Sequence, residues 1–415
     1  MWQALSVESW KARGRSDLSK VVPTVSDIID QVRKEGDRAV LRLTAKFDKV
    51  ELSDLKVSRE EIEEAYSKID AELLDALKFA RSRIESYHRR QRPDDVTLFR
   101  DGKSSLGWKY SPLASVGIYI PGGKASYPST ALMCAVPAKV AGVRSVIACT
   151  PPPVHPLTLV ALDMSGVDTV FKCGGAQAIA AMGLGTQTVP KVLKIVGPGN
   201  LYVTAAKVLL RQEAEMDFPA GPSEIAVLAD GTARPENVAA DILAQAEHGP
   251  DSACALVTDD AELIEKVGRI IEKSIQKSER QELILSSLKS SGHILVQDME
   301  EGVAVCNQLA PEHLSIQTKD PLSILPSIET AGAIFLGDHS PVACGDYTTG
   351  TDHVLPTAGN AAVHSGLDVL HFMKRSSVQM LDPETLEMLA PATLKLAETE
   401  GLRAHAESVR VRLKK

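Results

Sequence analysis

The fold is decided by residues 224–258, which read EIAVLADGTARPENVAADILAQAEHGPDSACALVT. The stretch opens with a short apolar run at 224–229 and closes with another at 253–258, and each has the length of a buried strand. Residues 237–248 have the pattern of a helix that a Gly-Pro pair ends. A strand, a helix and a second strand in this order predict an α/β fold with a parallel sheet.

The same alternation continues on both sides of this stretch. Downstream, apolar runs predict strands at 293–296, 314–317 and 333–336. Upstream, a separate series predicts strands at 116–120, 145–149, 169–173 and 192–197, with helices at 129–140 and 176–182. Two such series predict two Rossmann-like parallel-sheet domains covered by helices.

The two ends of the chain lack this alternation of strands and helices and have helical sequence patterns. Residues 1–100 have helical periodicity, with a capping box that begins at Ser58, and the last fifty residues are predicted to form an extended helical tail. A chain of 415 residues is too long for one core. We predict an N-terminal arm over 1–20, an α/β domain over 21–110 plus 222–365, a nucleotide-binding α/β domain over 111–221, and the helical tail over 366–415.

Composition and charge exclude several classes of protein. The net charge of −8 comes from mixed acidic and basic residues, which argues against a nucleic-acid-binding or membrane-surface protein. The sequence has neither an apolar run of about 18 residues nor the start of a signal peptide. Its six cysteines are scattered without a C-x-x-C pair, which favours reduced thiols and a cytoplasmic location.

Three glycine-rich turns follow predicted strands of the upstream series. They are VGIYIPGG at 116–123, GGAQ at 174–177 and GPGN at 197–200. None matches the G-x-G-x-x-G fingerprint, and any one of them alone is equally well explained as a plain tight turn. Three such turns at strand ends in one domain favour a bound nucleotide.

Two polar motifs lie at the ends of predicted elements. Gln245 and His248 share a helix face and can converge on one atom, although a lone histidine there is usually structural. Glu312 and His313 precede a predicted strand, where neighbouring residues point to opposite sides. They would pair poorly with each other but could flank a substrate, and a histidine suits a general base near neutral pH. Taken alone, this motif is more often explained as surface polar residues at the edge of a sheet.

The loop after the predicted strand at 333–336 carries Asp346, Asp352 and His353. Polar loops at the carboxyl ends of strands commonly carry function in α/β folds. His405, in the tail, is explained as a packing histidine when it is considered alone.

Together these segments resemble the histidinol dehydrogenase family. The resemblance is carried by IYIPGG at 118–123, GGAQAI at 174–179, GPGN at 197–200, PAGPSE at 219–224, QAEHGPDS at 245–252, APEHL at 310–314 and HVLPT at 353–357. It implies an NAD-dependent oxidation of L-histidinol to L-histidine in two steps through bound histidinal, the last step of histidine biosynthesis.

The resemblance also implies roles for individual residues. It implies a zinc site of Gln245, His248, Asp346 and His405, whose metal holds the substrate's imidazole and amino group. Glu312 and His313 match the acid-base pair, with His313 taking the alcohol proton and Glu312 activating water. Substrate contacts match Ser223, His353 and Glu400 besides the metal ligands and His313, and NAD contacts match Tyr119, Gln177 and Asn200.

In the family the tail crosses to a partner subunit, so the resemblance implies a homodimer with Glu400 and His405 supplied in trans. Three other readings stay open. One is a related zinc and NAD dehydrogenase of another small polar alcohol, such as a sulfonated diol. The second is a non-catalytic metal- or nucleotide-binding protein. The third is a thiohemiacetal route, for which Cys344, two residues before Asp346, is the nearest thiol.

Overall fold

The computed structural model describes residues 2–13, 17–122, 127–218 and 221–413. The chain divides into two compact units. The first unit is Met1–Gln91 with Leu113–Phe372, and the second unit is Arg92–Pro112 with Met373–Lys415. Gly123 and the Pro219-Ala220 pair of the family segments lie outside the described residues.

The larger sheet of the first unit has six parallel strands. These are β1 (Gln3–Ala4), β9 (Glu224–Ala229), β10 (Ala253–Thr258), β11 (Gly292–Leu295), β12 (His313–Gln317) and β13 (Ala333–Leu336), in the order β1-β11-β10-β9-β12-β13. After β1, which lies at one edge, the chain enters the middle of the sheet at β9 and then adds strands on either side of it. This doubly wound order places the switch in direction between β9 and β12.

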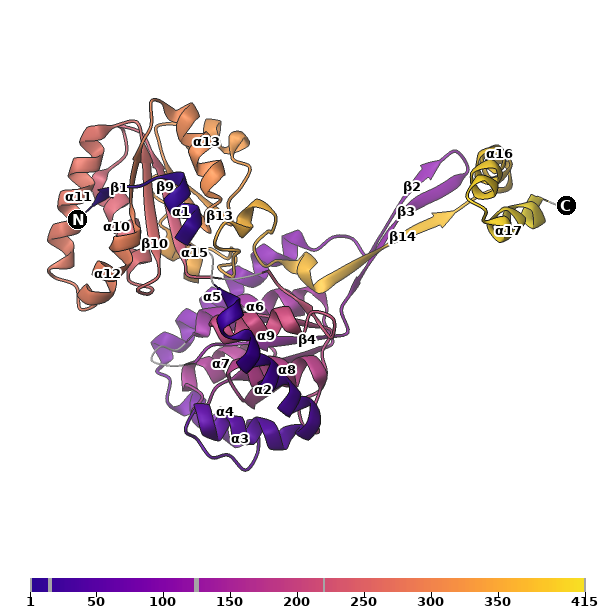
Figure 1. Ribbon diagram of the computed structural model, residues 1–415, viewed down its shortest axis with the longest axis horizontal. Coiled ribbons are helices and arrows are strands. Elements are labelled where there is room, and N and C mark those ends of the chain that lie inside the picture. Colours follow the sequence, from indigo (N-terminus) through magenta and orange to yellow (C-terminus); the bar gives the residue numbers. More distant parts are fainter. Residues whose placement is uncertain (1, 14–16, 123–126, 219–220, 414–415) are drawn as a thin grey trace. The chain divides into compact units, whose positions relative to one another are not determined.

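Helices cover both faces of this sheet (Figure 1). One face carries α10 (Pro235–Ala246), α11 (Ala261–Ile275) and α12 (Gln281–Ser287), and the other carries α1 (Val7–Arg13) and α13 (Met299–Leu309). Along β9, Ile225 and Val227 pack on the first set, while Ala226 and Leu228 pack on the second. Because successive side chains point to opposite faces, a strand covered on both sides is apolar at nearly every position.

The second sheet of the first unit has five parallel strands. These are β4 (Ser115–Tyr119), β5 (Ser145–Thr150), β6 (Thr169–Lys172), β7 (Lys194–Val196) and β8 (Glu215–Met216), in the order β6-β5-β4-β7-β8. Its helices are α2 (Val22–Glu35), α3 (Asp37–Phe47), α6 (Pro128–Ala141), α7 (Pro156–Met164), α8 (Gly175–Leu184) and α9 (Leu201–Leu209). The α4 helix (Arg59–Ser67) packs on α7, and α5 (Ala71–Gln91) packs on α6.

The two parallel sheets confirm the predicted α/β fold with two Rossmann-like domains. The core contacts place the N-terminal helices differently from the predicted 21–110 plus 222–365 domain. Val25, Val40 and other residues of α2 and α3 share a hydrophobic cluster with the five-stranded sheet, together with Ile147 and Ile195. The apolar stripes of these helices show that they pack on a sheet, but a stripe carries no information about which sheet it covers.

The second unit contains an antiparallel sheet that the sequence analysis did not predict. Its strands are β2 (Val96–Asp101), β3 (Ser104–Pro112) and β14 (Met373–Met380), in the order β14-β3-β2. The expectation that the tail is helical throughout is wrong for β14, whose sequence MKRSSVQM has no apolar alternation. This strand forms through pairing with β3 along its whole length, which no local pattern reports.

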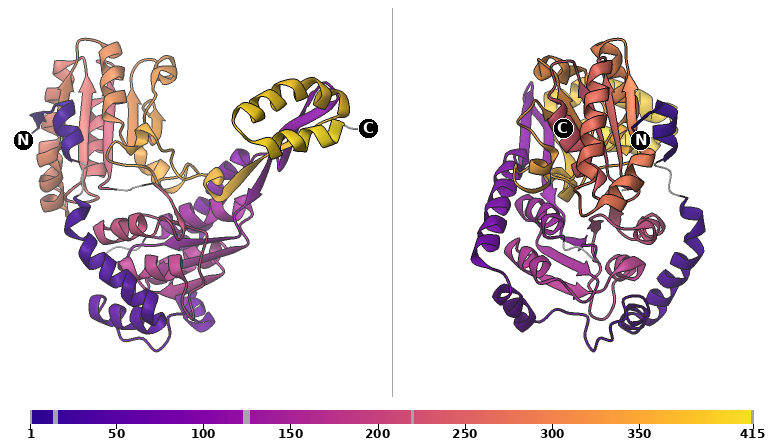
Figure 2. Two further views of the ribbon diagram at one scale, coloured as in Figure 1. Left: turned by 45° about the vertical axis from the view of Figure 1, so that its right-hand side comes forward. Right: turned by 90° about the vertical axis from the view of Figure 1, so that its left-hand side faces the viewer.

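Two helices, α16 (Pro383–Thr399) and α17 (Arg403–Leu413), complete the second unit and pack on each other (Figure 2). Asp382 caps α16 and exchanges hydrogen bonds with Ser104 of β3. The buried apolar residues described in this unit are only Ala390, Ala397 and Ala406. The unit therefore has almost no core of its own.

The remaining elements of the first unit are short. They are α14 (Pro321–Ile324), α15 (Val342–Tyr347) and the 3₁₀ turns Leu18–Lys20, Leu288–Ser290, Leu325–Ser327, Asn360–Ala362 and Val369–Phe372. Among the described residues, no helix is both long enough and apolar enough to span a bilayer.

Candidate active site

The predicted acid-base pair, Glu312 and His313, lies at the amino ends of two adjacent strands. Strands β9 and β12 are neighbours in register, with His313 opposite Ile225, so Glu312 begins its strand beside Glu224. These are the two strands between which the strand order of the six-stranded sheet reverses, but the pair lies at their amino ends, opposite the edge from which the crossovers leave.

Glu312 is a buried carboxyl group that accepts two hydrogen bonds. Its Oε2 accepts from the Ser223 hydroxyl at 2.7 Å and from the Glu224 backbone N–H at 2.8 Å. Burial raises the pKa of Glu312 to about 8, although these two hydrogen bonds oppose the shift. When it is deprotonated, this carboxylate is a stronger base than a glutamate in water, which suits proton abstraction from a water molecule.

His313 is held in one tautomer. Its Nδ1 lies 3.0 Å from the Glu224 carbonyl, which can only accept, so the proton is assigned to Nδ1. Its Nε2 is buried, has no hydrogen-bond partner among the described residues, and lies 3.9 Å from Asp346 Oδ1. Burial lowers the pKa of His313, so the ring is neutral near pH 7 and Nε2 can accept a proton.

The two members of the pair are closer to each other than the extended backbone suggested. Glu312 Oε2 and His313 Nδ1 lie 3.6 Å apart. Both side chains turn toward Glu224, one to its N–H and the other to its carbonyl. A shared backbone partner overrides the alternation that the sequence predicted.

Three predicted metal ligands arrive at this edge at the ends of helices. Gln245 lies in the last turn of α10, and His248 follows it, with its N–H bonded to the Gln245 carbonyl. Asp346 lies near the end of α15. A crossover helix runs back against its strand, so its last turn returns to the amino ends of the strands. Asp346 was expected at the carboxyl ends, and its proximity to His313 places it at the amino ends instead.

The chemical types of the predicted metal ligands in the first unit, an amide, an imidazole and a carboxylate, suit a zinc ion. The Gln245 Nε2 atom is buried and has no partner in the described part of the chain, so the amide has unused hydrogen-bonding capacity. Removal from water lowers the pKa of His248, and Asp346 opposes this shift while His313 and His353 add to it. Imidazole and carboxylate are usual zinc ligands. Within the described residues, however, no three His, Cys, Asp or Glu side chains converge closely enough to hold a metal ion.

His353 connects several parts of the first unit. Its Nδ1 lies 2.8 Å from the Asp346 carbonyl and its Nε2 lies 3.3 Å from the Thr130 hydroxyl of α6. The preceding residue, Asp352, is buried and accepts from the Val354 N–H at 2.8 Å. Its other oxygen faces His88 Nε2 of α5 at 3.6 Å. Asp352 thus anchors the loop that carries His353.

We expect Asp352→Asn to retain activity within about twofold, because the amide oxygen still accepts from the Val354 N–H. Asp352→Ala removes this acceptor and should lower kcat about tenfold, as expected for losing one buried hydrogen bond at a positioned loop. Steady-state rates and thermal melts of both variants check this. If the Asp352→Asn enzyme were as slow as the Asp352→Ala enzyme, activity would depend on the negative charge of Asp352 and not on its hydrogen bond to the Val354 N–H.

The expected NAD contacts lie around the switch point of the five-stranded sheet, between β4 and β7. Tyr119, at the end of β4, is buried, and its hydroxyl accepts from the Gly175 N–H that opens α8. Asn200 follows β7 and caps α9. Gly197 has a φ of +112°, and a side chain there would meet the Tyr119 carbonyl, so glycine is required. Gln177, in α8, is buried.

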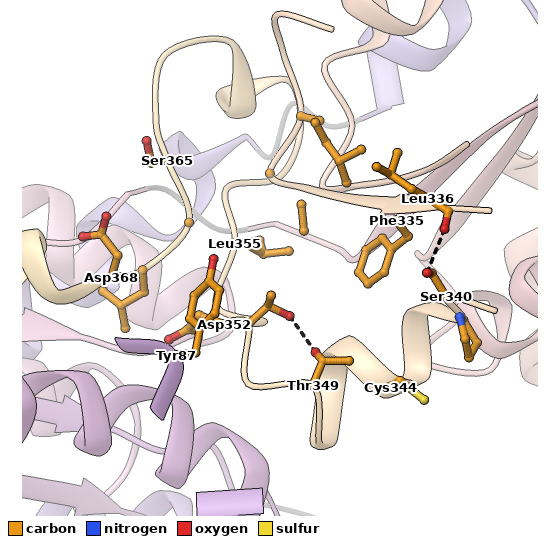
Figure 3. A pocket seen from close by; sticks show the side chains of 18 of the residues that line it. Tyr87, Phe335, Leu336, Ser340, Cys344, Thr349, Asp352, Leu355, Ser365 and Asp368 are labelled. Atoms are coloured by element: carbon orange, nitrogen blue, oxygen red, sulfur yellow. Dashed lines mark hydrogen bonds between the residues drawn. The ribbon is translucent and has the colours of Figure 1, made fainter. Parts of the chain in front are cut away.

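A groove of about 650 Å³ lies beside the edge strand β13 (Figure 3). It is lined by Phe335, Cys344, Thr349 and Asp352 among others, with Thr349 bonded to Thr351. Of the residues that form the candidate site, it includes none of the acid-base pair or the metal ligands in the described chain. The chemistry is therefore expected at the neighbouring strand starts and not in this groove.

The cysteines have different environments. Burial raises the pKa of the Cys134, Cys149, Cys254 and Cys306 thiols. Cys344 is exposed, on α15. The two predicted residues of the tail, Glu400 and His405, are exposed and belong to the second unit.

Sequence reasoning missed Glu224, whose backbone holds both members of the pair. One signal was available, since Glu224 is a carboxylate at the first position of the otherwise apolar run EIAVLA. A buried carboxyl group in such a place needs a hydrogen-bond or ion-pair partner, and this requirement predicts a cluster of polar residues at the start of the strand.

Two doubly wound sheets, one with glycine turns at its switch point and the other with a buried glutamate and histidine at adjacent strand starts, are the arrangement expected of an NAD-dependent dehydrogenase. A sequence model described as histidinol dehydrogenase matches residues 11–413. The chain belongs to the histidinol dehydrogenase family.

Individual relatives agree over nearly the full length. A histidinol dehydrogenase of Methanosarcina barkeri is 50% identical over 403 residues, which cover 96% of this chain and 93% of that protein. A histidinol dehydrogenase of Archaeoglobus fulgidus is 46% identical over 417 residues, which cover 98% of this chain and 99% of that protein. The crystal structure of histidinol dehydrogenase from Elizabethkingia anophelis has a TM-score of 0.94 at 37% identity, and covers 99% of this chain and 97% of that one.

Proposed function

We propose that this chain is a cytoplasmic enzyme that oxidises L-histidinol to L-histidine through bound histidinal, in a zinc-dependent reaction that uses two NAD⁺. It would catalyse the last step of histidine biosynthesis. The observation that carries the proposal is the buried pair at the β9 and β12 strand starts, where His313 Nδ1 lies 3.6 Å from Glu312 and the unpartnered Nε2 lies 3.9 Å from Asp346.

Each residue of the pair has a separate task. NAD supplies the hydride acceptor in both oxidations. In the first, the neutral His313 takes the hydroxyl proton at Nε2 as hydride leaves the carbinol carbon, and this gives the aldehyde. In the second, Glu312 takes a proton from water as the water oxygen bonds to the aldehyde carbon. Loss of a second hydride from that hydrate, with the remaining hydroxyl proton passing to His313 after it has released the first one, gives the carboxylate of histidine.

Zinc would be held by Gln245, His248, Asp346 and His405, where it would supply a Lewis-acid site for the imidazole and amino nitrogens of the substrate. Ser223, His353 and Glu400 would complete the substrate contacts. Tyr119, Gln177 and Asn200 would border the nucleotide. The high pKa of the buried thiols Cys134, Cys149, Cys254 and Cys306 disfavours the thiolate that a thiohemiacetal route needs, which favours water attack. The exposed Cys344 lines the groove beside β13.

We further propose a homodimer in which the tail crosses to the partner. The second unit exposes large apolar side chains, which include Leu98 (52%), Met388 (70%) and Leu396 (63%). Exposed apolar surface of this kind on a unit without a core calls for a partner. Exchange of the tail in a two-fold dimer buries this surface and brings Glu400 and His405 to the site of the other subunit.

Metal removal and substrate choice test the proposal together. Chelation should abolish NADH formation from histidinol and leave the far-UV circular dichroism unchanged, because the ligands lie at a sheet edge and not in a core. Added zinc should restore the rate, and a sulfonated diol should give none. His248→Ala should behave as the chelated enzyme does. Full activity of a metal-free preparation would contradict the metal site, and turnover of the diol instead of histidinol would identify the sister activity.

A further inference from the structure

Glu224 connects the two members of the acid-base pair through its backbone. Its N–H donates to Glu312 Oε2 at 2.8 Å, and its carbonyl accepts from His313 Nδ1 at 3.0 Å. The placement of the Glu312 carboxylate and the tautomer of His313 therefore both depend on where this one residue lies.

The side chain of Glu224 is itself buried and carries an ionisable carboxyl group. Its carboxylate is 2% exposed and accepts from the Ala358 N–H at 3.1 Å, in the segment that follows His353. Burial raises the pKa of Glu224 to about 7, the Arg13 guanidinium opposes this shift, and Glu312 adds to it. The Glu224 carboxyl group needs a cation beside it to be ionised in this buried place, because an unpaired buried charge is costly.

Arg13 is the cation that meets this requirement. It is the last residue of α1, its side chain is 15% exposed, and its guanidinium bonds to the Glu224 carboxylate. The guanidinium also lies 3.8 Å from the centre of the Trp10 ring. Trp10 in turn donates from Nε1 to the Leu309 carbonyl at 3.2 Å, which fixes α1 against the end of α13.

We propose that Arg13 is a positioning residue of this enzyme, which neutralises and anchors Glu224 so that the Glu224 backbone holds Glu312 and His313 in their working arrangement. Arg13 touches neither member of the pair and acts only through Glu224. The inference rests on the proposed function, because it concerns the residues that carry out the proton transfers.

Loss of Arg13 should affect turnover more than substrate binding. An unpaired Glu224 carboxylate would turn toward water or take up a proton, and the strand start would move with it. A displacement of about 1 Å in a catalytic group can cost about 10²-fold in rate. Among the described residues, Arg13 bonds to Glu224 and not to the predicted substrate-binding side chains of the first unit, Ser223 and His353, so KM should change little.

The test compares five variants with the wild-type enzyme. Arg13→Met removes the cation, Arg13→Lys retains it, Glu224→Gln removes the carboxylate but keeps the backbone bonds, and one variant combines Arg13→Met with Glu224→Gln. Ser6→Ala is the matched control, because it removes the hydroxyl that accepts from the Ser9 N–H in the first turn of α1 and leaves Arg13 in place. For each we would measure the melting temperature and the kcat and KM of histidinol and histidinal oxidation.

The proposal predicts a kcat for Arg13→Met at least about tenfold lower in both steps, with KM within about twofold, and partial rescue in Arg13→Lys. The combined variant should be no slower than Arg13→Met, since both changes act through one contact. Ser6→Ala should lower the melting temperature without lowering kcat. A normal kcat in Arg13→Met, or rate losses that simply follow the melting temperatures, would overturn the inference. Inactivity of the wild-type enzyme would instead overturn the proposed function.

Discussion

Glu312→Gln is expected to slow histidinal oxidation by about 10²- to 10³-fold and histidinol oxidation by less than about tenfold. The amide keeps the shape of the side chain and can still accept from Ser223 and the Glu224 N–H, but it cannot take a proton from water. Only the second oxidation needs that proton transfer. Single-turnover rates with each substrate separate the two steps.

His313→Asn should slow both steps, because each oxidation releases a proton from an oxygen of the substrate and the unpartnered Nε2 is the basic atom proposed to take it. The double variant should lose less than the product of the separate losses, since the two residues act as a unit. Equal and mild effects of both substitutions on both steps would show that these roles are assigned to the wrong residues.

Mixing two inactive variants should produce active enzyme. His248→Ala damages the first unit and His405→Ala damages the second. If the tail crosses, a mixed dimer contains one site with both lesions and one site with neither. About half of the sites in mixed dimers should then regain the wild-type rate. The measurement is NADH formation after subunit exchange, compared with each variant alone.

The control for this experiment is a proof of exchange, for example by mass spectrometry of differently tagged subunits. If each site were built from one chain, no mixed dimer would hold an intact site. Background activity after proven exchange would therefore rule out the shared site. A mixture of His248→Ala with Gln245→Ala, both in the first unit, should stay inactive under either arrangement and serves as the matched negative control.

The strands of the parallel sheets could be predicted from sequence because burial on both faces leaves an apolar signature. The bounds of β9, β10 and β13 agree with the predicted runs 224–229, 253–258 and 333–336. The sheet of the second unit could not be predicted in this way. The side chains of β14 are mostly exposed, and its hydrogen bonds go to residues far away in the sequence.

For the candidate site, motifs identified residue types but not their arrangement. Glu312 and His313 were expected on opposite sides of a strand, yet both turn to Glu224, and Asp346 lies at the other end of the sheet from the one expected. The Arg13 contact joins residues 211 positions apart and leaves no local pattern. Long-range ion pairs of this kind follow from the topology of the sheet, which only the folded chain specifies.

The central claim is that one site performs two successive oxidations of histidinol, and the stoichiometry of NADH tests it most directly. Purified enzyme with zinc, excess NAD⁺ and a limiting amount of L-histidinol should form two NADH for each histidinol consumed, and histidine should be the product found by chromatography. Histidinal should not accumulate, because it stays bound between the steps. One NADH per histidinol with release of the aldehyde, or no NADH at all, would contradict the account.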